Sequence, residues 1–125
     1  MNKKHKTIMW WVIILGAIAG LIAYAVYEES KPGEHDAFAT CIKDSGAQFY
    51  GAFWCPHCQS QKKMFGKSAE KLPYIECSTA NGQGQLPVCT DAGIKGYPTW
   101  RCPDGTEKSG TLSFAELADK TKCTQ

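Results

Sequence analysis

The sequence predicts an α/β domain with a central mixed four-stranded sheet flanked by helices, preceded by one N-terminal transmembrane helix. Three observations predict it: a long uncharged apolar run near the N-terminus, alternating short strand and helix patterns after it, and two closely spaced cysteines where a strand pattern meets a helix pattern. With 125 residues the chain allows one domain at most. We therefore expect a basic cytoplasmic segment 1–7, a transmembrane signal anchor 8–27, a linker 28–35 and a folded domain 36–125.

The apolar run 8–27 contains twenty residues without a charge, which is long enough to cross a bilayer as a helix. Lys3, Lys4 and Lys6 precede the run, whereas acidic residues follow it. Because basic flanks stay in the cytoplasm, we expect the C-terminal domain to lie across the membrane.

A cleaved signal peptide is the alternative interpretation of this run. Residues 23–25 (AYA) resemble a signal-peptidase site, with cleavage after Ala25. The apolar run continues past that site, which favours a retained anchor. In both cases the domain is exported.

Charge and cysteine content narrow the class of protein further. Without the three leader lysines, 11 of the 14 basic residues remain against 12 acidic ones, so the exported part is nearly neutral. It has no basic patch with interleaved aromatic residues, and we expect no nucleic-acid partner. Seven cysteines in a short exported chain predict disulfide bonds.

The exported part alternates between helix and strand patterns, and this order predicts a mixed sheet with helices on both sides. The expected elements are a helix 36–44, a strand 48–54, a helix 59–69, a strand 74–77, a Gly-rich loop 78–85, a short helix within 88–94, strands 99–101 and 107–111 around a turn at 104–105, and a last helix that begins with a capping box at 113–116.

The sequence Trp54-Cys55-Pro56-His57-Cys58 carries the chemistry that is easiest to interpret. Cys55 falls at a helix N-terminus, where free N–H groups and the helix dipole favour a thiolate. Pro56 fits the first helical turn because its missing N–H costs nothing there. Cys58 follows one turn later, close enough to attack a mixed disulfide formed at Cys55. This spacing is the minimum needed for dithiol–disulfide exchange.

A metal site is the competing interpretation of two cysteines at this spacing. A structural zinc needs four ligands, usually from a second close pair, and the remaining cysteines are all far apart in sequence: Cys41, Cys77, Cys89, Cys102 and Cys123. A copper-handling module would need Met or His ligands beside the thiols, but Met64 lies two helical turns away and His35 is in the linker. We expect no metal and no cofactor.

A second segment, Gly96-Tyr97-Pro98-Thr99, places a proline directly before a strand and after an aromatic residue, a candidate for a cis peptide. A WCxxC motif followed about forty residues later by Gly-Tyr-Pro-Thr resembles the thioredoxin superfamily. The resemblance implies that Pro98 is cis, faces the dithiol and keeps metals away from it. It also implies a substrate groove at Trp54, Tyr97 and Pro98, where the Tyr97 backbone binds an extended peptide.

Three segments resemble one branch of that superfamily: 50–58 (YGAFWCPHC), 72–77 (LPYIEC) and 92–100 (AGIKGYPTW). The branch is the thioredoxin-like domain fused to, or partnering, bacterial homologues of vitamin K epoxide reductase. This resemblance implies a single-pass protein of a bacterial cytoplasmic membrane, with its domain on the periplasmic or extracellular side. Its substrates would be cysteine-containing exported proteins. A separate membrane thiol oxidase resembling a vitamin K epoxide reductase homologue would reoxidise it.

Two features favour the oxidising direction of exchange. His57 beside Cys55 stabilises the thiolate and hence the reduced protein, and the Pro56-His57 pair resembles that of strongly oxidising periplasmic enzymes. Phe49 stands six residues before Cys55, where thioredoxins usually carry a buried acid that accepts the proton of the second thiol. Its loss should slow reductive resolution. A thiol reductase or disulfide isomerase remains the alternative.

The other cysteines allow several pairings. Cys77 and Cys89 bracket the Gly-rich loop, and a structural disulfide there would contribute about 3 kcal/mol in the chain-entropy model. A second redox-active pair that relays electrons is the alternative. Cys41 and Cys123 lie on the first and last helices of the domain, where they could bridge, although Cys41 also fits as a small buried residue. Cys102 is then either unpaired or a contact to another molecule.

Overall fold

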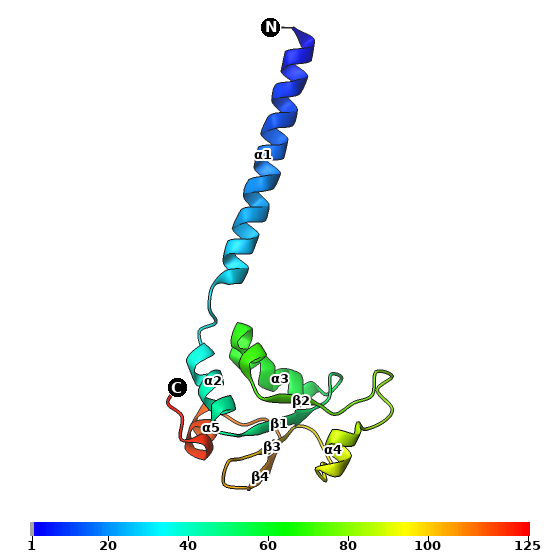
Figure 1. The fold of residues 1–125 in the computed structure, drawn as a ribbon, viewed down its shortest axis with the longest axis vertical. Coiled ribbons are helices and arrows are strands. Elements are labelled where there is room, and N and C mark those ends of the chain that lie inside the picture. The colour runs from blue at the N-terminus through cyan, green and yellow to red at the C-terminus, as the bar shows by residue number, and fades with distance from the viewer. Residues whose placement is uncertain (1) are drawn as a thin grey trace. The chain divides into compact units, whose positions relative to one another are not determined.

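The computed structural model describes residues 2–125, and the chain divides after Lys31 into two units (Figure 1). The N-terminal unit is a single helix, α1 (Lys3–Ser30), with none of its residues buried. An 18-residue stretch of it has a mean hydropathy of 2.2, so α1 is long and apolar enough to cross a membrane by length and composition. The predicted apolar N-terminal helix is confirmed, and it extends beyond 8–27 at both ends.

The second unit, Pro32–Gln125, is built on a four-stranded mixed sheet in the order β2-β1-β3-β4. The central strand β1 (Gln48–Gly51) pairs in parallel with β2 (Tyr74–Glu76) and antiparallel with β3 (Thr99–Arg101). β3 pairs antiparallel with the edge strand β4 (Glu107–Ser109). Parallel strands need a long crossover, and the helical segment between β1 and β2 supplies it (Figure 1). The predicted α/β fold class is therefore confirmed.

Helices cover both faces of the sheet because successive strand residues point to opposite sides. Phe49 and Trp100 are buried in one cluster with residues from three helices: α2 (Asp36–Asp44), α3 (Pro56–Phe65) and α5 (Phe114–Thr121). Tyr50, the next residue of β1, belongs to a second cluster together with Cys89 of the short helix α4 (Pro87–Asp91). The larger cluster is the core on which the cysteine motif rests.

Two predicted boundaries were wrong for the same reason, a local change of backbone direction. The strand predicted to reach residue 54 ends at Gly51, and Phe53 and Trp54 lie in the following turn with 48% and 51% of their surfaces exposed. The helix begins at Pro56, as the positions of Cys55 and Pro56 predicted, but it ends at Phe65 and not near residue 69, because Gly66 has a positive φ of 55°. A 3-10 helix, η1 (Gly66–Lys71), continues from there. Apolar composition alone did not reveal either break.

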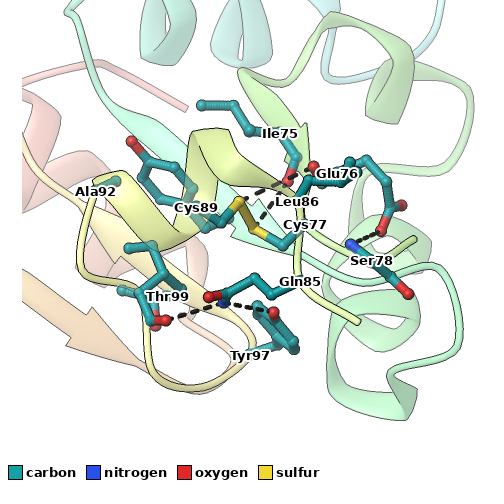
Figure 2. The surroundings of a disulfide bond; sticks show 12 residues. Ile75, Glu76, Cys77, Ser78, Gln85, Leu86, Cys89, Ala92, Tyr97 and Thr99 are labelled. Atoms are coloured by element: carbon teal, nitrogen blue, oxygen red, sulfur yellow. Dashed lines mark hydrogen bonds between the residues drawn. A yellow bond between two sulfur atoms is a disulfide. The ribbon is translucent and has the colours of Figure 1, made fainter. Parts of the chain in front are cut away.

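Two disulfides close loops of very different length. Cys41–Cys123 joins α2 to the C-terminal segment across a separation of 82 residues. Cys77–Cys89 joins the residue after β2 to α4 across 12 residues (Figure 2). Cys102 is free and only 6% exposed, so it is a buried unpaired thiol.

The two disulfides should contribute unequally to stability. In the chain-entropy model a loop of this longer size is worth about 4.5 kcal/mol and the shorter loop about 3 kcal/mol. We expect Cys41→Ser/Cys123→Ser to lower the free energy of unfolding more than Cys77→Ser/Cys89→Ser does. Urea titration of the detergent-solubilised chain, followed by near-ultraviolet circular dichroism, measures both; an equal or reversed loss would contradict this ranking.

Candidate active site

Cys55 is the N-cap residue of α3. Its backbone is extended (φ −77°, ψ 119°), Pro56 occupies the first turn, and the Cys58 backbone N–H donates to Cys55 Sγ at 3.4 Å. A helix N-terminus carries partial positive charge and unpaired N–H groups, so a negative charge on Cys55 Sγ is stabilised there. The turn that places Cys55 is itself fixed, since the Cys55 N–H donates to the Ala52 carbonyl at 3.0 Å.

The two thiols differ in access to solvent, and burial shifts the pKa of Cys58. Cys55 retains 4% of its exposure, whereas Cys58 is fully buried, so Cys55 is the more exposed sulfur although both are largely covered. Burial, together with the hydrogen bond to Cys55, raises the pKa of Cys58 to about 12 from its ordinary value of 9.0. At neutral pH Cys58 is therefore a neutral buried thiol, and attack from outside falls to Cys55.

Glu76, at the end of β2, fixes the segment before Cys55, and no sequence motif indicated this role. Its carboxylate accepts hydrogen bonds from Phe53 N at 3.2 Å, Ser78 N at 2.9 Å and the Tyr74 hydroxyl at 2.8 Å. Burial and this last hydrogen bond raise the pKa of Tyr74. Glu76 thereby holds the β1–α3 turn against the neighbouring strand.

Gln61 is the second residue that the sequence analysis missed. It is fully buried on α3, where its amide Nε2 donates to the Leu112 carbonyl at 3.0 Å. Its Oε1 accepts from Leu112 N at 2.7 Å and from Trp100 Nε1 at 3.2 Å. A buried amide with both ends paired locks α3 to β3 and to the segment before α5, which keeps the helix N-terminus in place.

The expected groove residues lie together, because the Trp54 and Tyr97 rings are in contact and Pro98 follows Tyr97 in the chain. The Tyr97–Pro98 peptide is cis and Pro98 is buried. The Trp54 ring meets the Tyr97 ring edge to face at 6.0 Å, and Tyr97 packs against the buried cluster that contains both thiols. Gln85 points to Tyr97, and its Nε2 donates to the Tyr97 hydroxyl at 2.7 Å (Figure 2).

The residues expected to tune the site differ in exposure. His57 is exposed, one residue into the first turn of α3 after Pro56. Phe49 is fully buried and stacks on Trp100 at a centroid distance of 4.5 Å. The position six residues before Cys55 is therefore occupied by an apolar side chain.

Within residues 2–125, no group of three or more His, Cys, Asp or Glu side chains is arranged to hold a metal ion.

Together, the mixed sheet and the cysteine pair at the start of α3 define a thioredoxin-like domain with an N-terminal apolar helix. No protein-family model matches the chain. The chain is similar to the thiol-disulfide oxidoreductase LTO1 of Arabidopsis thaliana, with 46% identity over 89 residues, which is 68% of this chain and 23% of that protein. It thus spans less than a quarter of the length of this relative, and the similarity supports a thioredoxin-like relationship.

The raised pKa of Cys58 predicts a pH dependence of stability. As the pH rises above 9, the unfolded chain loses the Cys58 proton while the folded protein still holds it, so folding loses stability between pH 9 and about 12. We expect the free energy of unfolding of Cys55→Ala to fall over this range relative to Cys55→Ala/Cys58→Ala. Tyr74 is present in both variants, so the difference isolates Cys58. Denaturant titrations at several pH values measure it, and a constant difference from pH 8 upward would contradict the raised pKa.

Proposed function

We propose that this protein is an exported, membrane-anchored thiol–disulfide oxidoreductase that oxidises protein thiols to disulfides. The observation that carries the proposal is the position of Cys55 as N-cap of α3, with the Cys58 N–H directed at its sulfur and a second, buried thiol one turn away. The similarity to a protein named thiol-disulfide oxidoreductase supports the same class of activity.

The reaction needs only sulfur atoms and protons. In the oxidised protein a client thiolate attacks Cys55 Sγ, the Cys55–Cys58 bond breaks, and its electron pair passes to Cys58 Sγ. A second client thiolate then attacks the client sulfur of the mixed disulfide and releases Cys55. The client has lost two electrons and two protons and has gained a disulfide, while both site cysteines are reduced. No cofactor takes part in these steps.

Features of four residues support the oxidising direction. A thiolate on Cys55 is stabilised by the helix N-terminus, with His57 nearby in the first turn after Pro56, and a stabilised reduced form makes the disulfide a stronger oxidant. The apolar Phe49 offers no carboxylate to accept the Cys58 proton. A neutral Cys58 thiol is a poor nucleophile, which disfavours the resolution of client disulfides by reduction.

The groove at Trp54, Tyr97 and Pro98 would hold an extended client segment beside Cys55, with the Tyr97 backbone as its hydrogen-bonding partner. We propose cysteine-containing exported proteins as clients and a membrane thiol oxidase, resembling a vitamin K epoxide reductase homologue, as the acceptor of the two electrons. In this proposal α1 anchors the protein once in a bacterial cytoplasmic membrane, with the domain on the periplasmic or extracellular side. The length and composition of α1 support a single membrane span.

The same sulfur geometry would run in reverse in a reductase or an isomerase, so the oxidation state of the pair in cells tests the proposal. We expect Cys55 and Cys58 to be mostly disulfide-bonded in cells, because the membrane oxidase withdraws electrons from them. Deleting that oxidase should make the reduced pair accumulate. Acid quenching, alkylation and peptide mass spectrometry measure the ratio, with Cys41–Cys123 as the disulfide that should stay intact in both strains.

The variant Cys58→Ala should also accumulate mixed disulfides with client proteins: the Cys55 thiolate attacks a client disulfide and displaces one client thiolate, and no Cys58 thiol is present to release Cys55. The double variant Cys55→Ala/Cys58→Ala is the matched control and should accumulate none. A pair that is reduced both with and without the oxidase would identify the protein as a reductase and overturn the oxidising direction.

A further inference from the structure

The Cys58 thiol shares a narrow space with the Tyr74 side chain, and Gly51 makes that space available. A Cβ on Gly51 would lie 2.7 Å from Tyr74 Cε2, 3.0 Å from Cys58 Sγ and 3.4 Å from the Tyr74 hydroxyl oxygen. Any side chain at position 51 would therefore push the phenol or the sulfur away. The glycine lets the ring of β2 lie against the buried sulfur of α3.

Tyr74 is held from three directions. Its Cα pairs with that of Phe49 in the parallel ladder, and the two rings meet edge to face at a centroid distance of 5.2 Å. Its hydroxyl donates to Glu76 at 2.8 Å. Lys62 Nζ lies 3.4 Å from the centroid of the Tyr74 ring. These contacts fix the position of the Tyr74 ring, and the Lys62 ammonium lies over its face.

Lys62 follows Cys58 by four residues on α3, so both side chains project from the same face of the helix, one turn apart. Lys62 is only partly exposed, whereas the adjacent Lys63 is exposed. The ammonium group is therefore directed toward the sheet by its contact with Tyr74, next to the space that contains Cys58 Sγ.

We propose that Lys62, seated on the Tyr74 ring, supplies the positive charge that stabilises the Cys58 thiolate each time the Cys55–Cys58 bond opens. This inference rests on the proposed thiol–disulfide exchange and assigns a positioning role within it. Lys62 does not touch the client; it acts on the sulfur that leaves.

The chemical need for such a charge follows from the burial of Cys58. When a client thiolate bonds to Cys55 Sγ, the electron pair of the broken bond stays on Cys58 Sγ, which has no exposure to water. A buried unpaired anion is costly. A hydrogen bond with the Ala52 backbone and, to a smaller extent, attraction to the Lys62 ammonium lower the pKa of Cys58, in opposition to the larger effect of burial.

The other ionisable groups around Cys58 do not meet that need. Cys55 precedes it on α3 and raises its pKa. From β2, the Tyr74 phenol is neutral, and the Glu76 carboxylate is negative and already accepts three hydrogen bonds. Among these groups Lys62 is the cation, and a cation stabilises the departing thiolate without having to accept a proton.

The test compares the rate at which 2-mercaptoethanol opens the Cys55–Cys58 disulfide of the oxidised full chain in detergent. We expect Lys62→Met to slow the opening roughly tenfold, because an opposite charge nearby typically lowers a pKa by 1 to 3 units and a better leaving thiol departs faster. Lys62→Arg should restore most of the rate. Lys63→Met removes the same charge from the next residue of α3 and should leave the rate within twofold of the wild type.

Three further measurements separate this role from a structural one. The rate for the wild type should fall with added salt more steeply than the rate for Lys62→Met. The Cys55–Cys58 disulfide should open faster in Tyr74→Phe, which keeps the aromatic ring, than in Tyr74→Leu, which removes the ring that the Lys62 ammonium contacts. The equilibrium constant with glutathione at pH 7 should be nearly unchanged in Lys62→Met, since Cys58 is a neutral thiol in the reduced protein.

A Lys62→Met rate equal to that of the wild type or of Lys63→Met would overturn the inference, as would a Lys62→Arg variant as slow as Lys62→Met. Lys62→Gln is a second neutral variant in case the methionine alters packing, and the same rate comparison applies to it. A wild-type protein that oxidises no client dithiol would instead refute the proposed function itself, so the two failures are distinguishable.

Discussion

The turn between β1 and α3 is the constraint on which the site depends. The chain leaves the sheet at Gly51, reverses within four residues and enters α3 with Cys55 as its N-cap. Only this geometry gives one sulfur the N–H groups of a helix terminus while it buries the other sulfur a turn deeper. Glu76 of the neighbouring strand binds the backbone of the turn at Phe53, and Gln61 binds α3 to the backbone of Leu112. The position of Cys55 is therefore determined by contacts with segments that are distant in sequence.

The remaining architecture keeps the reactive sulfurs apart from the structural ones. Cys41–Cys123 fastens the ends of the domain, and Cys77–Cys89 fastens the loop that follows β2. That loop also contributes Gln85, whose amide binds the Tyr97 hydroxyl next to the groove (Figure 2). The short disulfide therefore supports the groove through its loop, whereas the long one supports the fold as a whole.

Local patterns in the sequence predicted the fold class and the place of the cysteine motif. Proline directly after Cys55 and a capping box at Ser113 are short-range signals, and helices begin at both positions in the structure. Exposure was not predictable in the same way. Phe53 and Trp54 look like strand residues by composition but lie on the surface of a turn.

The supporting contacts were invisible to sequence reasoning because they join distant segments. Gln61 binds Leu112 across 51 positions, and Glu76 binds Phe53 across 23. Lys62 gave no signal either, since a lysine within a run of polar residues usually marks a solvated helix face. Its meaning depends on Tyr74, which reaches it through the parallel pairing of β1 with β2 and the space left by Gly51.

The most direct measurement is disulfide transfer between the purified oxidised chain and a reduced, unfolded polypeptide that contains two cysteines. After acid quenching and alkylation, peptide mass spectrometry counts which sulfurs have changed. The account predicts one new client disulfide for each Cys55–Cys58 pair that becomes reduced, with the bonds at Cys41–Cys123 and Cys77–Cys89 untouched. Transfer from either of those two bonds, or no transfer while Cys55–Cys58 stays closed, would contradict it.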